Sequence, residues 1–70
     1  MREDEIEALC ALHGARLIVH RDLAGTGFTA HIYGKGTHHS ATVEEGARVT
    51  AVQEAWEQFD EYQKCITNKT

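Results

Sequence analysis

Histidine is the residue type with which this chain could do chemistry, since five of its 70 residues are histidines. Strand alternation predicts that His20, His31 and His38 project from one face of a sheet. Side chains directly opposite on adjacent strands lie about 5 Å apart, close enough to share a metal ion or a bound phosphate. Imidazoles titrate near a pKa of about 6.5, so the same face could instead respond to pH. We favour the simpler interpretation of solvated strand residues and expect no metal ligand and no cofactor.

Other reactive side chains form no catalytic pattern. No serine, cysteine or carboxylate has a partner at a recognisable spacing, and the GxSxG, HExxH and phosphate-loop motifs are absent. Gly25-Thr26-Gly27 and Gly34-Lys35-Gly36-Thr37 are too short to cradle a nucleotide and are typical of hairpin turns. Cys10 and Cys65 belong to no CxxC motif, and the acidic opening is unlike a signal peptide. We therefore expect a non-enzymatic cytoplasmic protein with free thiols.

Charge is divided unevenly along the chain. The formal net charge of −4 argues against a strong general nucleic-acid binder. Ten of the eleven acids lie in residues 3–7, 44–45 and 54–61, whereas residues 14–43 hold three bases against one acid. This division predicts acidic helices and a mildly basic sheet. The candidate binding residues on the sheet face are Arg16, His20, His31, Tyr33, Lys35 and His38, and those on the acidic helix face are Glu54, Glu57 and Glu61. The simpler interpretation of such charged helix faces is that they are only solvated.

Length and composition indicate one small domain spanning residues 1–70. Hydrophobic residues make up 41% and charged residues 26%, which is ordinary globular usage. No apolar run approaches the roughly 20 residues that a membrane span needs, so no membrane association is expected. A chain this short lies near the limit of independent stability, and a homodimer would be a natural supplement.

Hydrophobic periodicity predicts five elements. The stripe Ile6, Leu9, Cys10 and His13 predicts a helix over about residues 3–13, which Gly14 ends. Alternation predicts strands over residues 16–21, 28–33 and 38–44, and the register of the third is the least constrained. A second helix is predicted from about Arg48 to Cys65, followed by a polar tail over residues 67–70.

This order predicts an α+β fold of α-β-β-β-α type, with a three-stranded antiparallel sheet and both helices packed on one face. The predicted core joins the inward strand residues to the apolar stripes of the helices. It comprises Leu17, Val19, Phe28, Ala30, Ile32, Ala41 and Val43 from the strands, and Ile6, Leu9, Val52, Trp56 and Phe59 from the helices.

This layout resembles the double-stranded RNA-binding domain, from Ile6 to Tyr62. Phe28–Gly34, followed by a third strand and an alanine-bearing helix, looks like the second half of that family. The resemblance implies RNA as a partner. That family carries a lysine cluster at the start of its second helix; the corresponding residues here, 48–51, contain one base. The family also has a histidine in the loop between its first two strands, whereas residues 23–27 contain none.

A second similarity covers residues 16–62. Residues 18–22 with Gly25, then Phe28–Ile32 and Ala51–Tyr62, look like the three strands and helix of HicB-type antitoxins. The chain differs from them by its additional first helix and by lacking their Gly-Asp-Thr lead into the long helix. In style, a small acidic chain ending in an Ala-Trp helix also resembles phage-encoded accessory proteins.

Two functional hypotheses follow. The leading one is a non-enzymatic module that binds another protein through the sheet or the acidic helices, as an inhibitor or a phage accessory protein does. The alternative is a nucleic-acid-binding module of the double-stranded RNA-binding layout, using Arg16, His20, His31, Tyr33 and Lys35.

Overall fold

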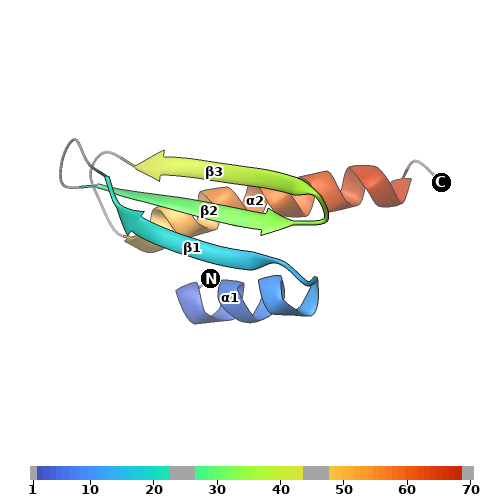
Figure 1. Ribbon diagram of the computed structural model, residues 1–70, viewed down its shortest axis with the longest axis horizontal. Helices are drawn as coiled ribbons and strands as arrows, with labels where there is room; N and C mark the ends of the chain where they lie inside the picture. Colours follow the sequence, from blue (N-terminus) through green and yellow to red (C-terminus); the bar gives the residue numbers. More distant parts are fainter. Residues whose placement is uncertain (1, 23–26, 44–47, 69–70) are drawn as a thin grey trace.

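Five elements follow one another along the chain in the order helix, three strands, helix. The computed structural model describes residues 2–22, 27–43 and 48–68, with side chains up to residue 65. The elements are α1 (Glu3–Leu12), β1 (Arg16–Arg21), β2 (Phe28–Gly34), β3 (Thr37–Val43) and α2 (Arg48–Asn68) (Figure 1). The α+β fold of α-β-β-β-α type predicted from periodicity is therefore confirmed.

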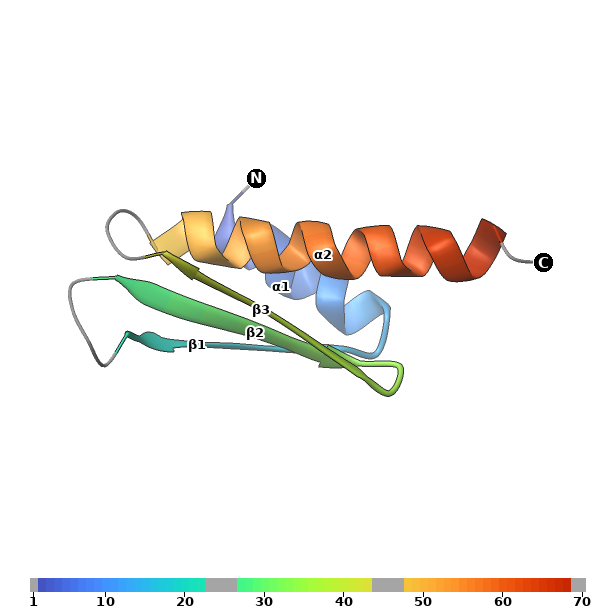
Figure 2. The ribbon, with the colours of Figure 1, turned by 90° about the horizontal axis from the view of Figure 1, so that it is seen from above.

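The three strands form an antiparallel meander in the order β1-β2-β3, and both helices lie on the same side of it (Figure 2). In the register of the central strand, His31 lies opposite Ile18 and Ser40, and Tyr33 lies opposite Arg16 and His38. The predicted register of the third strand is thus correct, with Ala41 and Val43 facing the helices. One face of the sheet is covered and the other is open.

A two-residue turn joins β2 to β3. Lys35 and Gly36 both have positive φ, 51° and 75°, between the paired residues Gly34 and Thr37. Two successive positive φ angles define the type I′ turn, whose twist matches that of the flanking strands. This turn fixes the register that places His38 beside Tyr33. The predicted turn over residues 24–27 lies mostly outside the described residues, as do Glu44 and the predicted break at Gly46.

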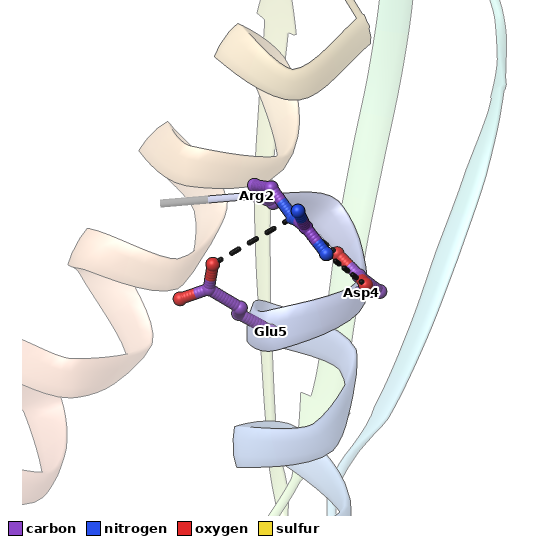
Figure 3. A network of polar contacts seen from close by, with 3 residues as sticks. All are labelled: Arg2, Asp4 and Glu5. Carbon is purple, nitrogen blue, oxygen red and sulfur yellow. Dashed lines mark hydrogen bonds and ion pairs between the residues drawn. The ribbon is translucent and has the colours of Figure 1, made fainter.

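Charges and a glycine set the two ends of α1. Its first turn is acidic, and guanidinium nitrogens of Arg2 lie 3.1 Å from a carboxylate oxygen of Asp4 and 3.8 Å from one of Glu5 (Figure 3). Negative charge in a first turn is favoured by the helix dipole. At the other end Gly14 has a φ of 70°, and the amide of Ala15 donates to the carbonyl of Cys10 at 2.8 Å. Gly14 therefore ends the helix in a left-handed conformation, as predicted.

The core lies between the covered sheet face and the helices. Its fully buried large side chains include Ile6, Ile32, Val52 and Phe59, and Trp56 is only 8% exposed. The other predicted strand residues on this face pack around it half-buried. Three small residues are also buried: Cys10, Ala51 and Ala55. Cys10 lies on the predicted apolar stripe of the first helix and Ala55 on the predicted apolar side of the second, whereas Ala51 was not predicted. Both cysteines are free, Cys10 buried and Cys65 exposed.

The second helix is longer than its apolar stripe indicated. Residues 67 and 68, predicted as a polar tail, belong to α2, whose last turns extend past the β2–β3 turn (Figures 1 and 2). The chain after Cys65 contains no glycine or proline, so nothing local ends the helix there. In the described part of the chain, no helix is both long and apolar enough to cross a membrane.

Candidate functional site on the open sheet face

The sheet face that no helix covers carries most of the predicted binding residues. Strand alternation and the register place nine side chains on this open face, three from each strand. They are Arg16, Ile18 and His20 from β1, Thr29, His31 and Tyr33 from β2, and His38, Ser40 and Thr42 from β3. The open face is thus mainly aromatic and hydroxyl-bearing, with one cationic side chain, Arg16.

Four rings on the open face form one continuous group, here called the ring cluster: His20, His31, Tyr33 and His38. Tyr33 stacks on His38, with ring centres 4.4 Å apart and planes inclined by only 6°. His31 lies 6.0 Å from Tyr33, 5.1 Å from His38 and 5.0 Å from His20, between ring centres. The three histidines that alternation placed on one face are therefore in direct contact.

The histidines contact one another through their ring nitrogens. Nε2 of His20 lies 2.9 Å from Nε2 of His31, and Nδ1 of His31 lies 2.8 Å from Nε2 of His38. The ring centres are about 2 Å farther apart than these nitrogens, so the rings meet edge to edge. We call this arrangement the histidine row. Its spacing is that of hydrogen bonds between imidazoles.

This spacing differs from that of a bound metal ion. In a tetrahedral zinc site, two zinc–nitrogen bonds of about 2.0–2.1 Å hold the ligand nitrogens about 3.3–3.4 Å apart. In the row the nitrogens that face each other are about 0.5 Å closer than that. Among the described residues, no group of three or more histidine, cysteine, aspartate or glutamate side chains has an arrangement that could hold a metal ion.

His31 occupies the centre of the row, and its environment disfavours the charged form. Partial desolvation lowers the pKa of His31 below its usual value, and the neighbouring His20 and His38 lower it further. His20 and His38 are exposed, whereas His31 is half-buried between them. The central ring therefore protonates less readily than an ordinary imidazole.

The charge around the ring cluster is positive. The three strands contain no aspartate or glutamate, while Arg16 lies on the open face and Arg21 is exposed at the end of β1. Lys35, a candidate residue of the sheet face, lies exposed in the β2–β3 turn at one end of that face, where the sequence predicted a hairpin turn. Arg48, at the start of α2, is paired with Glu3 at 2.8 Å.

The acidic candidates lie apart from the ring cluster. Glu54, Glu57 and Glu61 are all exposed on α2, which packs against the covered side of the sheet. Their spacing places them along one face of that helix. The structure therefore separates an acidic helical side from a mildly basic, aromatic open face, as the charge distribution predicted.

Two features of the open face were not predicted as parts of the binding site. They are the exposed side chain of Ile18 and the stacking of Tyr33 on His38. Ile18 lies opposite His31 on the neighbouring strand and is 41% exposed, so it adds apolar area to the open face. Tyr33 was predicted, but its stacking on His38 was not. Alternation already assigned Ile18 to this face, so the signal for it was present in the sequence.

His39 shows how sharply the two faces differ. It follows His38 directly, yet it lies on the helix side, 5.8 Å from Phe59 and 5.3 Å from Tyr62 between ring centres. Adjacent strand residues point to opposite faces, so His39 takes no part in the ring cluster.

No family model, curated protein or solved structure matches this chain. The similarity to the double-stranded RNA-binding domain is thus one of layout, and no relative supports it or the similarity to HicB-type antitoxins.

Proposed function

We propose that this protein is a small non-enzymatic interaction module that binds an acidic partner protein through its open sheet face. The observation that carries this proposal is the ring cluster, a continuous group of four rings on a face that no helix covers. Tyrosine and arginine are enriched in protein interfaces, where flat rings supply contact area at little entropic cost. An inhibitory or phage accessory role is the cellular setting that we propose for this binding.

The chemistry of the partner follows from charge. The strands carry arginine and histidine and no carboxylate, so a surface with aspartate or glutamate complements them. A second copy of this chain docked through the same face would place no carboxylate against Arg16, since the three strands contain none. It therefore lacks the charge that complements this face. We therefore propose a different, acidic protein as the partner.

RNA is the other class of partner, and the charges favour it less. In the double-stranded RNA-binding layout, the start of α2 carries a lysine cluster; here the only base among residues 48–51 is Arg48, which is already paired with Glu3. The helical side adds a repelling acidic background.

Site-specific photocrosslinking in the source cell tests the proposal. The photoreactive residue p-benzoylphenylalanine replaces Ser40, which is exposed on the open face opposite His31. In the matched control it replaces Glu57, which is exposed on α2. We expect position 40, and not position 57, to crosslink to one protein at an acidic segment, and Tyr33→Ser to abolish the crosslink. Crosslinking from position 57 alone, or from position 40 to RNA, would overturn the proposal.

A further inference from the structure

The histidine row has one direction when it is neutral. Nδ1 of His20 lies 3.1 Å from the backbone carbonyl oxygen of Arg21, which can only accept a hydrogen bond. Nδ1 of His20 therefore carries the hydrogen, and Nε2 of the neutral ring accepts. His31 must then donate from Nε2 and accept at Nδ1, where His38 donates from Nε2. A single carbonyl thus sets the tautomers of all three rings.

The row has one further position for a proton. In the neutral arrangement, Nδ1 of His38 is an acceptor, and it has no hydrogen-bond partner among the described residues. A proton added there leaves both inter-ring hydrogen bonds intact. It can also pass along the row, since each hydrogen bond can shift its proton to the next ring. Every resulting arrangement keeps both inter-ring bonds and the bond to Arg21, with one positive charge in total.

A second added proton breaks the row. Two inter-ring contacts, the contact to Arg21 and the outer Nδ1 of His38 provide four positions for hydrogens. Three neutral rings fill three of them, and one proton fills the fourth. Any further proton puts two hydrogens between one pair of nitrogens, 2.8 or 2.9 Å apart. That contact then becomes repulsive, and two neighbouring rings carry like charges.

We propose that His20, His31 and His38 act as one unit that takes up and shares a single proton, and that this proton regulates the charge of the surface that binds the partner. This regulation rests on the proposed function, whereas the proton sharing is a property of the chain alone. Uptake of the proton adds a positive charge to a face that already carries Arg16, and so strengthens its attraction for carboxylates. Binding of an acidic partner is accordingly coupled to proton uptake.

The other charged and titratable groups around the row are few. Arg16 and Tyr33 share the open face with it, Lys35 lies in the turn beyond His38, and Asp22 follows β1 two residues after His20. Both helices pack on the opposite side of the sheet, so neither faces the row. Arg16 and Lys35 further oppose a second proton.

Nitrogen-15 NMR of the histidine rings in the isolated protein tests the proton sharing. At pH 8 we expect the hydrogen on Nδ1 of His20 and on Nε2 of His31 and His38. On acidification, the ring nitrogen shifts of all three histidines should change together over one pH range as the row takes up its first proton. The two further protons should bind only at lower pH. In His31→Ala, His20 and His38 should each titrate in one independent step. The control His13→Ala, at the rim of α1 near Trp56, should leave the shared titration unchanged.

Either of two results would overturn the inference. One is three independent single-step titrations in the wild-type protein. The other is a hydrogen on Nε2 of His20 at pH 8. This measurement uses only the wild-type protein, so it does not depend on whether a variant folds. Neither result depends on a partner, so failure here and failure of the proposed function are distinguishable.

Discussion

Gly34 lies so close to Ala15 that a β-carbon added at Gly34 would stand 2.6 Å from the Ala15 Cβ and 3.1 Å from its Cα. The contact joins the end of β2 to the segment between α1 and β1. An alanine methyl is fixed to the backbone, so it cannot rotate away. The segment after α1 therefore passes so close to the end of β2 that no side chain fits at position 34 without a shift of the backbone.

We therefore expect Gly34→Ala to lower the free energy of unfolding by about 1–3 kcal/mol through overpacking. Urea unfolding followed by circular dichroism measures the change. Ala15→Gly removes the opposing methyl. The double variant should therefore be more stable than the sum of the two single changes in the free energy of unfolding predicts. Strictly additive effects of the two substitutions would contradict this explanation of the glycine.

Phe59 is fully buried at the centre of the core, and Trp56 lies beside it, with ring centres 5.9 Å apart. Phe59→Ala should cost about 3–5 kcal/mol, enough to unfold a domain of ordinary marginal stability. The emission of Trp56 should be at shorter wavelength in the folded wild type than in denaturant, because only 8% of the residue is exposed. Folded wild type with solvent-exposed tryptophan emission would contradict the observed packing.

The two thiols should differ in reactivity. Burial, and to a smaller extent the charge of Glu7, raises the pKa of the buried Cys10 thiol, which disfavours the reactive thiolate. With a disulfide reagent at pH 8, we expect one fast thiol from the exposed Cys65 and a slow one that reacts only when the chain opens. Cys65→Ser should remove the fast phase alone. Two equally fast thiols in the folded protein would be inconsistent with this packing.

Stability should fall at mildly acidic pH partly because of His31. Its pKa is lowered in the folded state, so the unfolded chain binds more protons as the pH falls below about 6.5, the usual imidazole pKa. The stabilisation is present above that pH and is lost as the pH falls towards the folded-state pKa. Urea unfolding from pH 8 to 5 should show a smaller loss in His31→Gln than in the wild type. Parallel pH profiles would exclude this role for His31.

The sequence alone predicted the element order, the strand register and the histidines of the open face, because period-two alternation fixes which side chains share a face. It did not predict the nitrogen-to-nitrogen contacts of His20, His31 and His38, which depend on side-chain rotamers and on sheet twist. Ala51 was missed as a core residue because close packing of α2, rather than its small apolar side chain, buries it. The end of α2 was missed because the helix continues through threonine and asparagine, which are poor helix formers.

Double-stranded RNA should not bind with micromolar affinity at about 150 mM salt, because the chain carries seven lysines and arginines against eleven acids, and these acids repel phosphate. Fluorescence anisotropy with a labelled duplex measures this directly. Saturable binding at that salt concentration, lost in Arg16→Ala or Lys35→Ala, would show that RNA rather than an acidic protein is the partner.

The affinity for the purified partner identified by crosslinking at position 40 decides whether the protein binds through its open sheet face. Isothermal titration of wild type, Tyr33→Ser and the control Glu57→Gln compares the open face with the acidic helix face. We predict that Tyr33→Ser weakens binding at least about tenfold, a loss of roughly 1.4 kcal/mol, and that Glu57→Gln leaves the affinity unchanged. Unchanged affinity in Tyr33→Ser, or a loss confined to Glu57→Gln, would contradict binding through the ring cluster.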